Sequence, residues 1–265
     1  MYSPFKLALK YLKYYATASN GKGHGIHSPF VFDFITQLLN DRHLYPEYEK
    51  VETLRLKMKA DNREVIVEDF GAGSAMAKTN KRSIASIARH AAKPTKWGQL
   101  LFRTVKKYQP QTIIELGTSL GITSSYLSLA QTASQLKTLE GAAAIAGVAQ
   151  QNFDNLGLKN IESVTGNFDD TLPIVLNKLD KLDLAFIDGN HRQQPTENYF
   201  NLMLKKTHPG SILIFDDIHW SAEMEAAWHT IKSHPSVKCS IDLFFLGFVF
   251  FREEFKERQE FVIRF

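Results

Sequence analysis

The sequence predicts an α/β protein with a doubly wound, mostly parallel sheet. From residue 111 onward, apolar runs of strand length alternate with helical patterns. Runs such as IIEL and SILIF are apolar on both faces, as expected of strands that helices cover on each side. Near the C-terminus, two strand-like runs are joined by only a short charged link, which predicts a closing antiparallel hairpin.

The expected strands occupy five runs before this hairpin. They are TIIEL (112–116), LKTLE (136–140), NIESVT (160–165), LDLAFID (182–188) and SILIFDD (211–217). Helices are expected over 123–133, over 141–157 with a stop at Gly157, over 195–207, and over 221–234 after a serine cap. The hairpin should pair CSIDLFFLGFVFFREE (239–254) with EFVIRF (260–265).

The N-terminal third lacks this alternation. Helical stretches at FKLALKYLKYYA, PFVFDFITQLLN and SIASIARHAA surround one short strand candidate, EVIVEDF (64–70). We therefore expect an N-terminal, mainly helical cap or lid over residues 1–95 and a core domain over residues 96–265.

Cysteine content and the length of the apolar runs indicate the cellular compartment that we expect for the protein. The only cysteine is Cys239, which excludes an internal disulfide and a thiolate metal cluster and fits a reducing compartment. The N-terminus lacks the unbroken apolar core of a signal peptide, and LFFLGFVFF has about half the length of a membrane-spanning helix. We expect a cytoplasmic protein without membrane insertion. The sequence leaves the oligomeric state open, a homo-oligomer included.

Charge is distributed unevenly along the chain. Residues 1–110 contain 19 Lys/Arg against 9 Asp/Glu, whereas residues 111–265 contain 13 against 19. Either two solvated surfaces differ by chance, or the basic part attracts an acidic substrate or a polyanion. No lysine-arginine block is dense enough to indicate nucleic acid on its own.

Two glycine-rich turns follow strand-like runs: VIVEDFGAGS (65–74) and IIELGTSLG (113–121). A nucleotide-binding loop needs a helix after it and a second strand that ends in an acid about 20 residues on. The first turn fails, because no Asp or Glu follows it until Glu115. The second passes, because Glu140 ends the next strand 23 residues after Gly117. Ser119 in place of a middle glycine leaves less room for a pyrophosphate.

Three carboxylates end two later strands: Asp188 in FIDGNH, and Asp216 with Asp217 in IFDDIHW. Ligands of open α/β sheets bind beyond the carboxyl ends of strands, and crowded acids repel one another unless something compensates. A hard divalent cation such as Mg²⁺ would suit these oxygens. The alternative is that Asp217 caps the following turn and only Asp188 faces the ligand.

The stretch from Gly98 to Ser128, followed by TLEG and GNFDDTLP, resembles class I S-adenosylmethionine-dependent methyltransferases, which have a Rossmann-like fold. The nearest branch is that of the catechol and caffeoyl-CoA O-methyltransferases, and the resemblance covers roughly residues 95–265. It implies S-adenosylmethionine as cofactor. The residues that it implies for cofactor binding are Glu115, Gly117, Thr118, Ser119 and Gly121 for the methionine part, Glu140 with Gly141 for the ribose, Phe168 and Asp169 beside the adenine, and Asp188.

The resemblance also bears on metal and catalysis. Metal-dependent members hold Mg²⁺ at positions that Asp188, Asp216 and Asp217 occupy here, with Asp217 in place of an asparagine. His191 stands three residues after Asp188, where the catechol enzymes have a catalytic lysine. An imidazole is suited to take a proton from an acceptor hydroxyl, although His191 could also only hydrogen-bond a loop. His219 is a weaker second candidate.

Two segments have no assigned role in this scheme. Phe70–Ser74, with Lys78, Lys81 and Arg82, could line an acceptor pocket under the cap, or form a tight packing turn. HGIHSPF has two histidines three apart, but it lacks further close ligands, so an ordered loop before a helix is the better interpretation.

The predicted function is methyl transfer to a hydroxyl of a small acceptor, a catechol, phenol or sugar, with His191 and Asp188 as catalytic residues. One alternative is a nucleic-acid methyltransferase, which the basic N-terminal part would favour. Another is a catalytically inactive module that only binds the cofactor. A nicotinamide dehydrogenase is disfavoured by Ser119 and by the closing hairpin.

Overall fold

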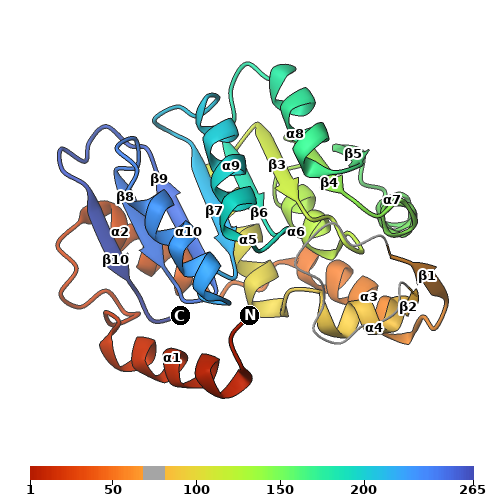
Figure 1. The fold of residues 1–265 in the computed structure, drawn as a ribbon, viewed down its shortest axis with the longest axis horizontal. Coiled ribbons are helices and arrows are strands. Elements are labelled where there is room, and N and C mark those ends of the chain that lie inside the picture. The colour runs from red at the N-terminus through yellow and green to blue at the C-terminus, as the bar shows by residue number, and fades with distance from the viewer. Residues whose placement is uncertain (68–80) are drawn as a thin grey trace. The chain divides into compact units, whose positions relative to one another are not determined.

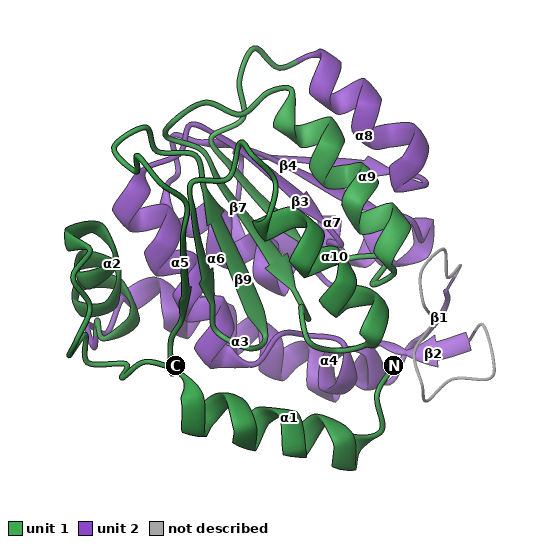
Figure 2. Cartoon of the chain, turned by 60° about the vertical axis from the view of Figure 1, so that its left-hand side comes forward, with its two compact units in different colours: residues 1–41, 179–265 green, residues 42–178 purple. Residues whose placement is uncertain are grey.

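The computed structural model describes residues 1–67 and 81–265. Contacts group the chain into two compact units, residues 1–41 with 179–265 (unit 1) and residues 42–178 (unit 2), which Figure 2 colours green and purple. The glycine-rich segment Phe70–Ser74 and Lys78 lie outside the described residues. The expected division at residue 95 stays a prediction.

Unit 2 contains a parallel sheet flanked by helices, drawn from orange to green in Figure 1. Its elements are α3 (Pro46–Ala60), β1 (Glu64–Ile66), β2 (Lys81–Ser83), α4 (Ile84–His90), α5 (Thr95–Tyr108), β3 (Thr112–Leu116), α6 (Ile122–Ala130), β4 (Gln135–Glu140), α7 (Ala143–Leu156), β5 (Ile161–Thr165) and α8 (Phe168–Asn177). β4 pairs in parallel with β3 and with β5. The register sets Leu116 opposite Leu139 and Glu140 opposite Thr165, so the loops after all three strands leave from one edge.

Local chemistry explains several boundaries in unit 2. α7 ends at Gly157, whose φ of 68° suits glycine because it has no Cβ to clash. α8 begins after Asn167, whose side chain accepts a hydrogen bond from the backbone N–H of Asp169. β1 and β2 form a separate two-stranded antiparallel ribbon. α3 had no counterpart among the predicted helices, since its sequence has little apolar periodicity.

Unit 1 contains the N-terminal helices and the second half of the strands. Its elements are α1 (Pro4–Thr17), α2 (Pro29–Asp33), the π-helix η1 (Phe34–Leu39), β6 (Leu184–Ile187), α9 (Gln193–Leu204), β7 (Ile212–Asp216), α10 (Ala222–Lys232), β8 (Cys239–Asp242), β9 (Leu246–Phe250) and β10 (Gln259–Val262). β6 and β7 are parallel, whereas β9 is antiparallel to both β7 and β8. Every residue of β6, β7, β8 and β9 is buried, including the polar Ser240 and Asp242 of β8 and Asp216 at the end of β7.

The C-terminal hairpin is confirmed, but its predicted strand pairing is wrong. The hairpin lies within the first run, between β8 and β9, and turns at Phe244 with a φ of 72°. β10 pairs with β8 in the parallel direction. The reason is that β7 and β8 already pair with the two edges of β9. β10 therefore takes the other edge of β8.

The predicted fold class is confirmed: the strands are mostly parallel with antiparallel strands near the C-terminus, helices flank them, and helices precede them at the N-terminus. All five predicted strands form within one or two residues of their expected ends. None of the helices in the described ranges combines the length and apolar character needed to cross a bilayer.

Candidate active site

The loop after β3 is built from left-handed backbone conformations. Gly117, Ser119 and Gly121 have φ values of 99°, 48° and 76°. The backbone N–H groups of Gly117 and Thr118 both donate to the carbonyl of Leu139 at the end of β4, at 2.9 and 3.2 Å. These bonds hold the loop across the ends of two neighbouring strands, which is where a parallel sheet binds ligands.

Gly121 is required by packing. A Cβ at this position would lie 2.5 Å from the ring of Phe153 and 3.3 Å from the Cβ of Ala149, both on α7. The glycine therefore lets α6 begin close to α7, and the backbone N–H groups at the start of α6 belong to the same turn.

Glu140 joins the loop after β3 to the loop after β4. Its Oε2 accepts the backbone N–H of Ser119 at 2.8 Å, and its Oε1 accepts that of Ala142 at 3.1 Å. The side chain is only half-buried, and a carboxylate oxygen can accept more than one hydrogen bond. The orientation of this carboxylate is thus set before any ligand binds.

Glu115 is fully buried at the end of β3. The hydroxyls of Ser124 and Thr138 both donate to its Oε2, and the Thr118 hydroxyl lies 2.6 Å from that of Thr138. Burial raises the pKa of Glu115 to about 7, against the lowering effect of the two hydroxyls, and the charge of Glu140 adds to the rise. Thr118 of the loop is therefore linked to Glu115 through the Thr138 hydroxyl, and the contact of both residues with the cofactor stays a prediction.

The segment after β5 completes this edge of unit 2. The backbone N–H of Gly166 donates to the carbonyl of Glu140 at 2.9 Å, which holds the start of α8 beside the end of β4. Phe168, at the start of α8, is half-buried, and Asp169 is exposed. Gly141, which follows β4, is half-buried. The structure thus gathers the ends of β3, β4 and β5, as the sequence predicted.

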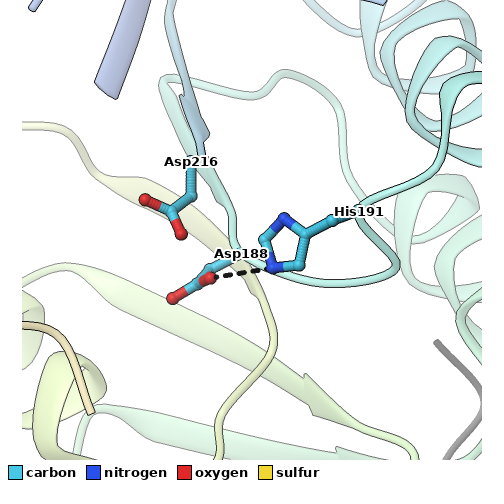
Figure 3. A group of neighbouring side chains, drawn as sticks. All are labelled: Asp188, His191 and Asp216. Carbon is cyan, nitrogen blue, oxygen red and sulfur yellow. Dashed lines mark ion pairs between the residues drawn. The ribbon is translucent and has the colours of Figure 1, made fainter. Parts of the chain in front are cut away.

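A second group of side chains lies in unit 1, at the ends of β6 and β7. Asp188, His191 and Asp216 each offer one ligand atom, and these atoms lie within 4.8 Å of one another (Figure 3). The Nε2 of His191 is 3.5 Å from Oδ1 of Asp188. Asp216 is buried, whereas Asp188 and His191 are partly exposed. Two carboxylates and an imidazole form a donor set that fits a divalent cation.

The structure does not bring Asp217 into this group, although the sequence predicted it as a metal ligand. Asp217 has a left-handed φ of 52°, and its backbone N–H donates to the carbonyl of Phe245 at 2.7 Å. Its own carbonyl accepts the N–H of Trp220. Asp216 and Asp217 therefore have different backbone conformations, and the third member of the group is His191.

The loop that carries His191 is positioned by residues that the sequence analysis missed. Asn190 has a left-handed φ of 54°, and its Nδ2 donates to the buried Tyr199 hydroxyl at 3.1 Å. The Nε of Arg192 donates to the Asn190 side-chain oxygen at 2.8 Å. Asparagine tolerates the left-handed region better than most residues, so the pair Gly189-Asn190 was the available signal.

His219 belongs to a different network. Its Nδ1 lies 3.0 Å from Glu225 and its Nε2 lies 2.8 Å from Asp242. Burial by itself lowers the pKa of His219, but the hydrogen bonds and charges of Asp242 and Glu225 raise it above the ordinary value. With both ring nitrogens engaged, His219 is poorly suited to act as a base, and His191 is the better candidate.

Comparison with known proteins shows which family part of this chain resembles. Residues 114–218, which contain both the glycine loop and the Asp188 group, match the family model described as a methyltransferase domain. Residues 114–218 are therefore similar to methyltransferase domains. Glu115, Glu140, Asp188 and Asp216 lie within the matched residues.

The chain is also similar to individual proteins and solved structures. A tRNA (guanine-N(7)-)-methyltransferase of Mycoplasma mobile is 29% identical over 149 residues, which cover 50% of this chain and 74% of that protein. An O-methyltransferase of Bacillus cereus, solved with S-adenosylhomocysteine, is 20% identical with a TM-score of 0.56, covering 83% of this chain and 97% of that one. A Podospora anserina methyltransferase bound to S-adenosylhomocysteine is 13% identical with a TM-score of 0.59, covering 85% and 97%.

The predicted resemblance to class I S-adenosylmethionine-dependent methyltransferases is therefore confirmed by a domain match and by fold. The prediction that the chain is an enzyme of this methyltransferase class is confirmed with it. The roles of individual residues of the methyltransferase domain stay predictions.

Proposed function

We propose that the chain transfers the methyl group of S-adenosylmethionine to a hydroxyl of a small acceptor, a catechol, phenol or sugar, assisted by a divalent cation. The observation that supports O-methylation most directly is the group formed by Asp188, His191 and Asp216. Two of these side chains are carboxylates beside an imidazole, which is the chemistry needed to hold a cation and accept a proton.

The methyl donor is assigned to the edge of unit 2. Glu140 has a carboxylate already oriented by two backbone N–H groups, and it would accept the ribose hydroxyls. The turn Gly117–Gly121 would hold the methionine part, and Phe168 with Asp169 would border the adenine. The printed descriptions of the Bacillus and Podospora structures, both with S-adenosylhomocysteine, support this cofactor.

The acceptor is assigned to the Asp188 group. A phenol has a pKa near 10 and is mostly neutral at pH 7, so it must lose its proton to attack a methyl group. A bound divalent cation would stabilise the phenolate. Asp188 and Asp216 would hold the cation, and His191 would accept the proton, because its imidazole is only partly buried and lies 3.5 Å from Asp188.

Calorimetry tests the two assignments separately. Wild-type protein is titrated with S-adenosylhomocysteine, with NAD, and with Mn²⁺ as a divalent probe. We expect S-adenosylhomocysteine to bind and NAD not to bind. Asp188→Asn and Asp216→Asn should each weaken Mn²⁺ binding at least tenfold, whereas Asp180→Asn, an exposed carboxylate of unit 1, should not. Mn²⁺ affinity equal in all four proteins would remove the cation site.

Activity tests the role of His191. Transfer of labelled methyl groups to a panel of catechols, phenols and sugars should require Asp188. His191→Gln should lower kcat at least about 100-fold, because general-base catalysis contributes about 10²- to 10⁴-fold, while leaving Mn²⁺ affinity within about twofold. A large loss of Mn²⁺ affinity in this variant would instead make His191 a ligand. Cofactor binding without transfer to any acceptor would favour an inactive binding module.

RNA is the second candidate acceptor, because a tRNA methyltransferase is among the relatives and residues 1–110 are basic. Binding to bulk tRNA at 50 and 200 mM salt tests this. Proteins that contact several phosphates lose about 10³- to 10⁵-fold in affinity over this range. Tight, salt-sensitive binding with methylation of the RNA would replace the small-molecule proposal.

A further inference from the structure

The N-terminal helix α1 exposes an apolar face that no other part of unit 1 covers in the described residues. Phe5, Leu9 and Leu12 are 75%, 51% and 63% exposed. Their spacings of four and three residues place them in one stripe along the helix. The opposite side of the helix carries Tyr11 and Tyr14, which pack against Phe244.

α1 is held in this orientation at both ends. At its middle, the Lys10 ammonium lies 2.9 Å from Glu225, and just before its start the Tyr2 hydroxyl donates to the same carboxylate at 2.7 Å. Near its end, the Tyr14 hydroxyl donates to the carbonyl of Ile263. Rotating the apolar stripe inward would break these contacts, so its exposure is a property of the folded unit.

Cations border the stripe. α1 contains Lys6, Lys10 and Lys13 and no acidic residue. Lys10 pairs with Glu225, and the Lys6 ammonium lies 4.2 Å from the centroid of the Tyr2 ring. Lys6 and Lys13 are both exposed and follow Phe5 and Leu12 by one position. At the end of the helix, the Arg264 guanidinium lies 5.2 Å from the ring centroid of the exposed Tyr15.

We propose that this face of α1 adsorbs to the surface of an anionic lipid bilayer, with the helix axis in the plane of the interface. An exposed apolar stripe with a lysine border and no acid is the pattern of interfacial helices. The lysines would contact anionic headgroups while Phe5, Leu9 and Leu12 enter the boundary with the acyl chains. This inference does not depend on the proposed reaction.

A second copy of the chain fits the face less well. Two such stripes facing each other would bring their lysine borders together without an acidic counterpart on the helix. Three side chains also form a patch far below the roughly 800 Å² per partner of a standard protein interface. Self-association through α1 is therefore an outcome that the experiment has to distinguish.

Vesicle sedimentation of the full chain tests the proposal, with phosphatidylcholine vesicles containing 30% phosphatidylserine and vesicles of phosphatidylcholine alone. We expect binding to the first, weakened by raising NaCl from 0.1 to 0.5 M, and little binding to the second. Lys6→Gln/Lys13→Gln should reduce affinity about 25-fold, at about fivefold for each lysine. Leu9→Gln/Leu12→Gln should reduce it at least about tenfold.

Matched controls use the exposed residues of α3. Leu56→Gln and Lys50→Gln/Lys57→Gln change the same residue types on another exposed helix face and should bind like the wild type. Sedimentation velocity is run on every protein. Equal binding to both vesicle types, or an α1 variant that binds like the wild type, would overturn the proposal. So would absence of vesicle binding together with a wild-type dimer that Leu9→Gln/Leu12→Gln dissociates. If an α1 variant fails to fold, the lipid and salt dependence of the wild type still decides.

Discussion

The carboxylate of Glu140 accepts a hydrogen bond from the backbone N–H of Ser119, 21 residues earlier in the chain, at 2.8 Å. Ser119 has a left-handed φ of 48°, a conformation that a serine adopts only when its surroundings hold it there. This hydrogen bond thus fixes Glu140, at the end of β4, relative to the turn after β3. Both were predicted to contact the same cofactor, and this bond couples their geometry.

Glu140→Gln should weaken binding of S-adenosylhomocysteine about 10- to 100-fold. An amide keeps one oxygen, but its NH₂ group would face the N–H of Ser119 or of Ala142, and hydrogen bonds to a charged group contribute about 1.5–3 kcal/mol. Calorimetry measures the affinity, with Glu162→Gln, an exposed carboxylate on β5, as the control. An unchanged affinity in Glu140→Gln would remove Glu140 from the cofactor site.

Gly121→Ala should lower the free energy of unfolding by about 2–4 kcal/mol. The added Cβ would lie 2.5 Å from the Phe153 ring, and the alanine would have to adopt a φ of 76°. Overpacking and backbone strain therefore add together. Gly147→Ala on α7 is the matched control, because its Cβ meets nothing within 4 Å. It should stabilise the protein by roughly 0.5–1 kcal/mol, as Ala does in a helix. Urea unfolding in which both substitutions have the same effect would contradict this account.

Glu115 should make stability fall as the pH rises. Its pKa is about 7 in the folded chain against an ordinary 4.5, so between these values the folded state holds a proton that the unfolded state has released. The free energy of unfolding should therefore decrease from about pH 4.5 to about pH 7, by up to about 3 kcal/mol. Glu115→Gln cannot titrate and should remove this slope.

Urea unfolding at several pH values measures the effect of Glu115. Glu49→Gln, an exposed carboxylate on α3, should retain the wild-type slope. If Glu115→Gln keeps the slope as well, another group is responsible for it.

Tyr199→Phe should weaken Mn²⁺ binding about two- to tenfold and leave S-adenosylhomocysteine affinity unchanged. The lost hydroxyl accepts from Nδ2 of Asn190, and one such bond contributes about 0.5–1.5 kcal/mol to holding the loop between Asp188 and His191. Calorimetry with each ligand separates the two effects. Tyr11→Phe serves as control, and equal Mn²⁺ affinities in Tyr199→Phe and wild type would show that Asn190 does not position the loop.

Local sequence patterns were sufficient for the strands and most helices of the domain. A run that is apolar on both faces has few alternatives to a buried parallel strand, which is why TIIEL became β3 with the predicted bounds. Gly157 ended α7 as predicted, because glycine adopts the left-handed conformation without strain. The distance from Gly117 to Glu140 predicted that they share an edge, because a βαβ unit returns the chain to the same end of the sheet.

Only the tertiary structure determined the features that depend on contacts between residues distant in sequence, such as strand pairing and the side chains of the Asp188 group. β10 pairs with β8 because β9 already has neighbours on both edges, and occupancy of a strand edge is a property of the whole sheet. The group at the ends of β6 and β7 contains His191 and not Asp217, whose left-handed backbone and bond to Phe245 join it to a segment distant in sequence. Periodicity in a sequence encodes which residues are buried. It does not encode which strand edges pair, or which carbonyls and side chains come into contact between segments distant in sequence. Those contacts determine the geometry of the candidate site.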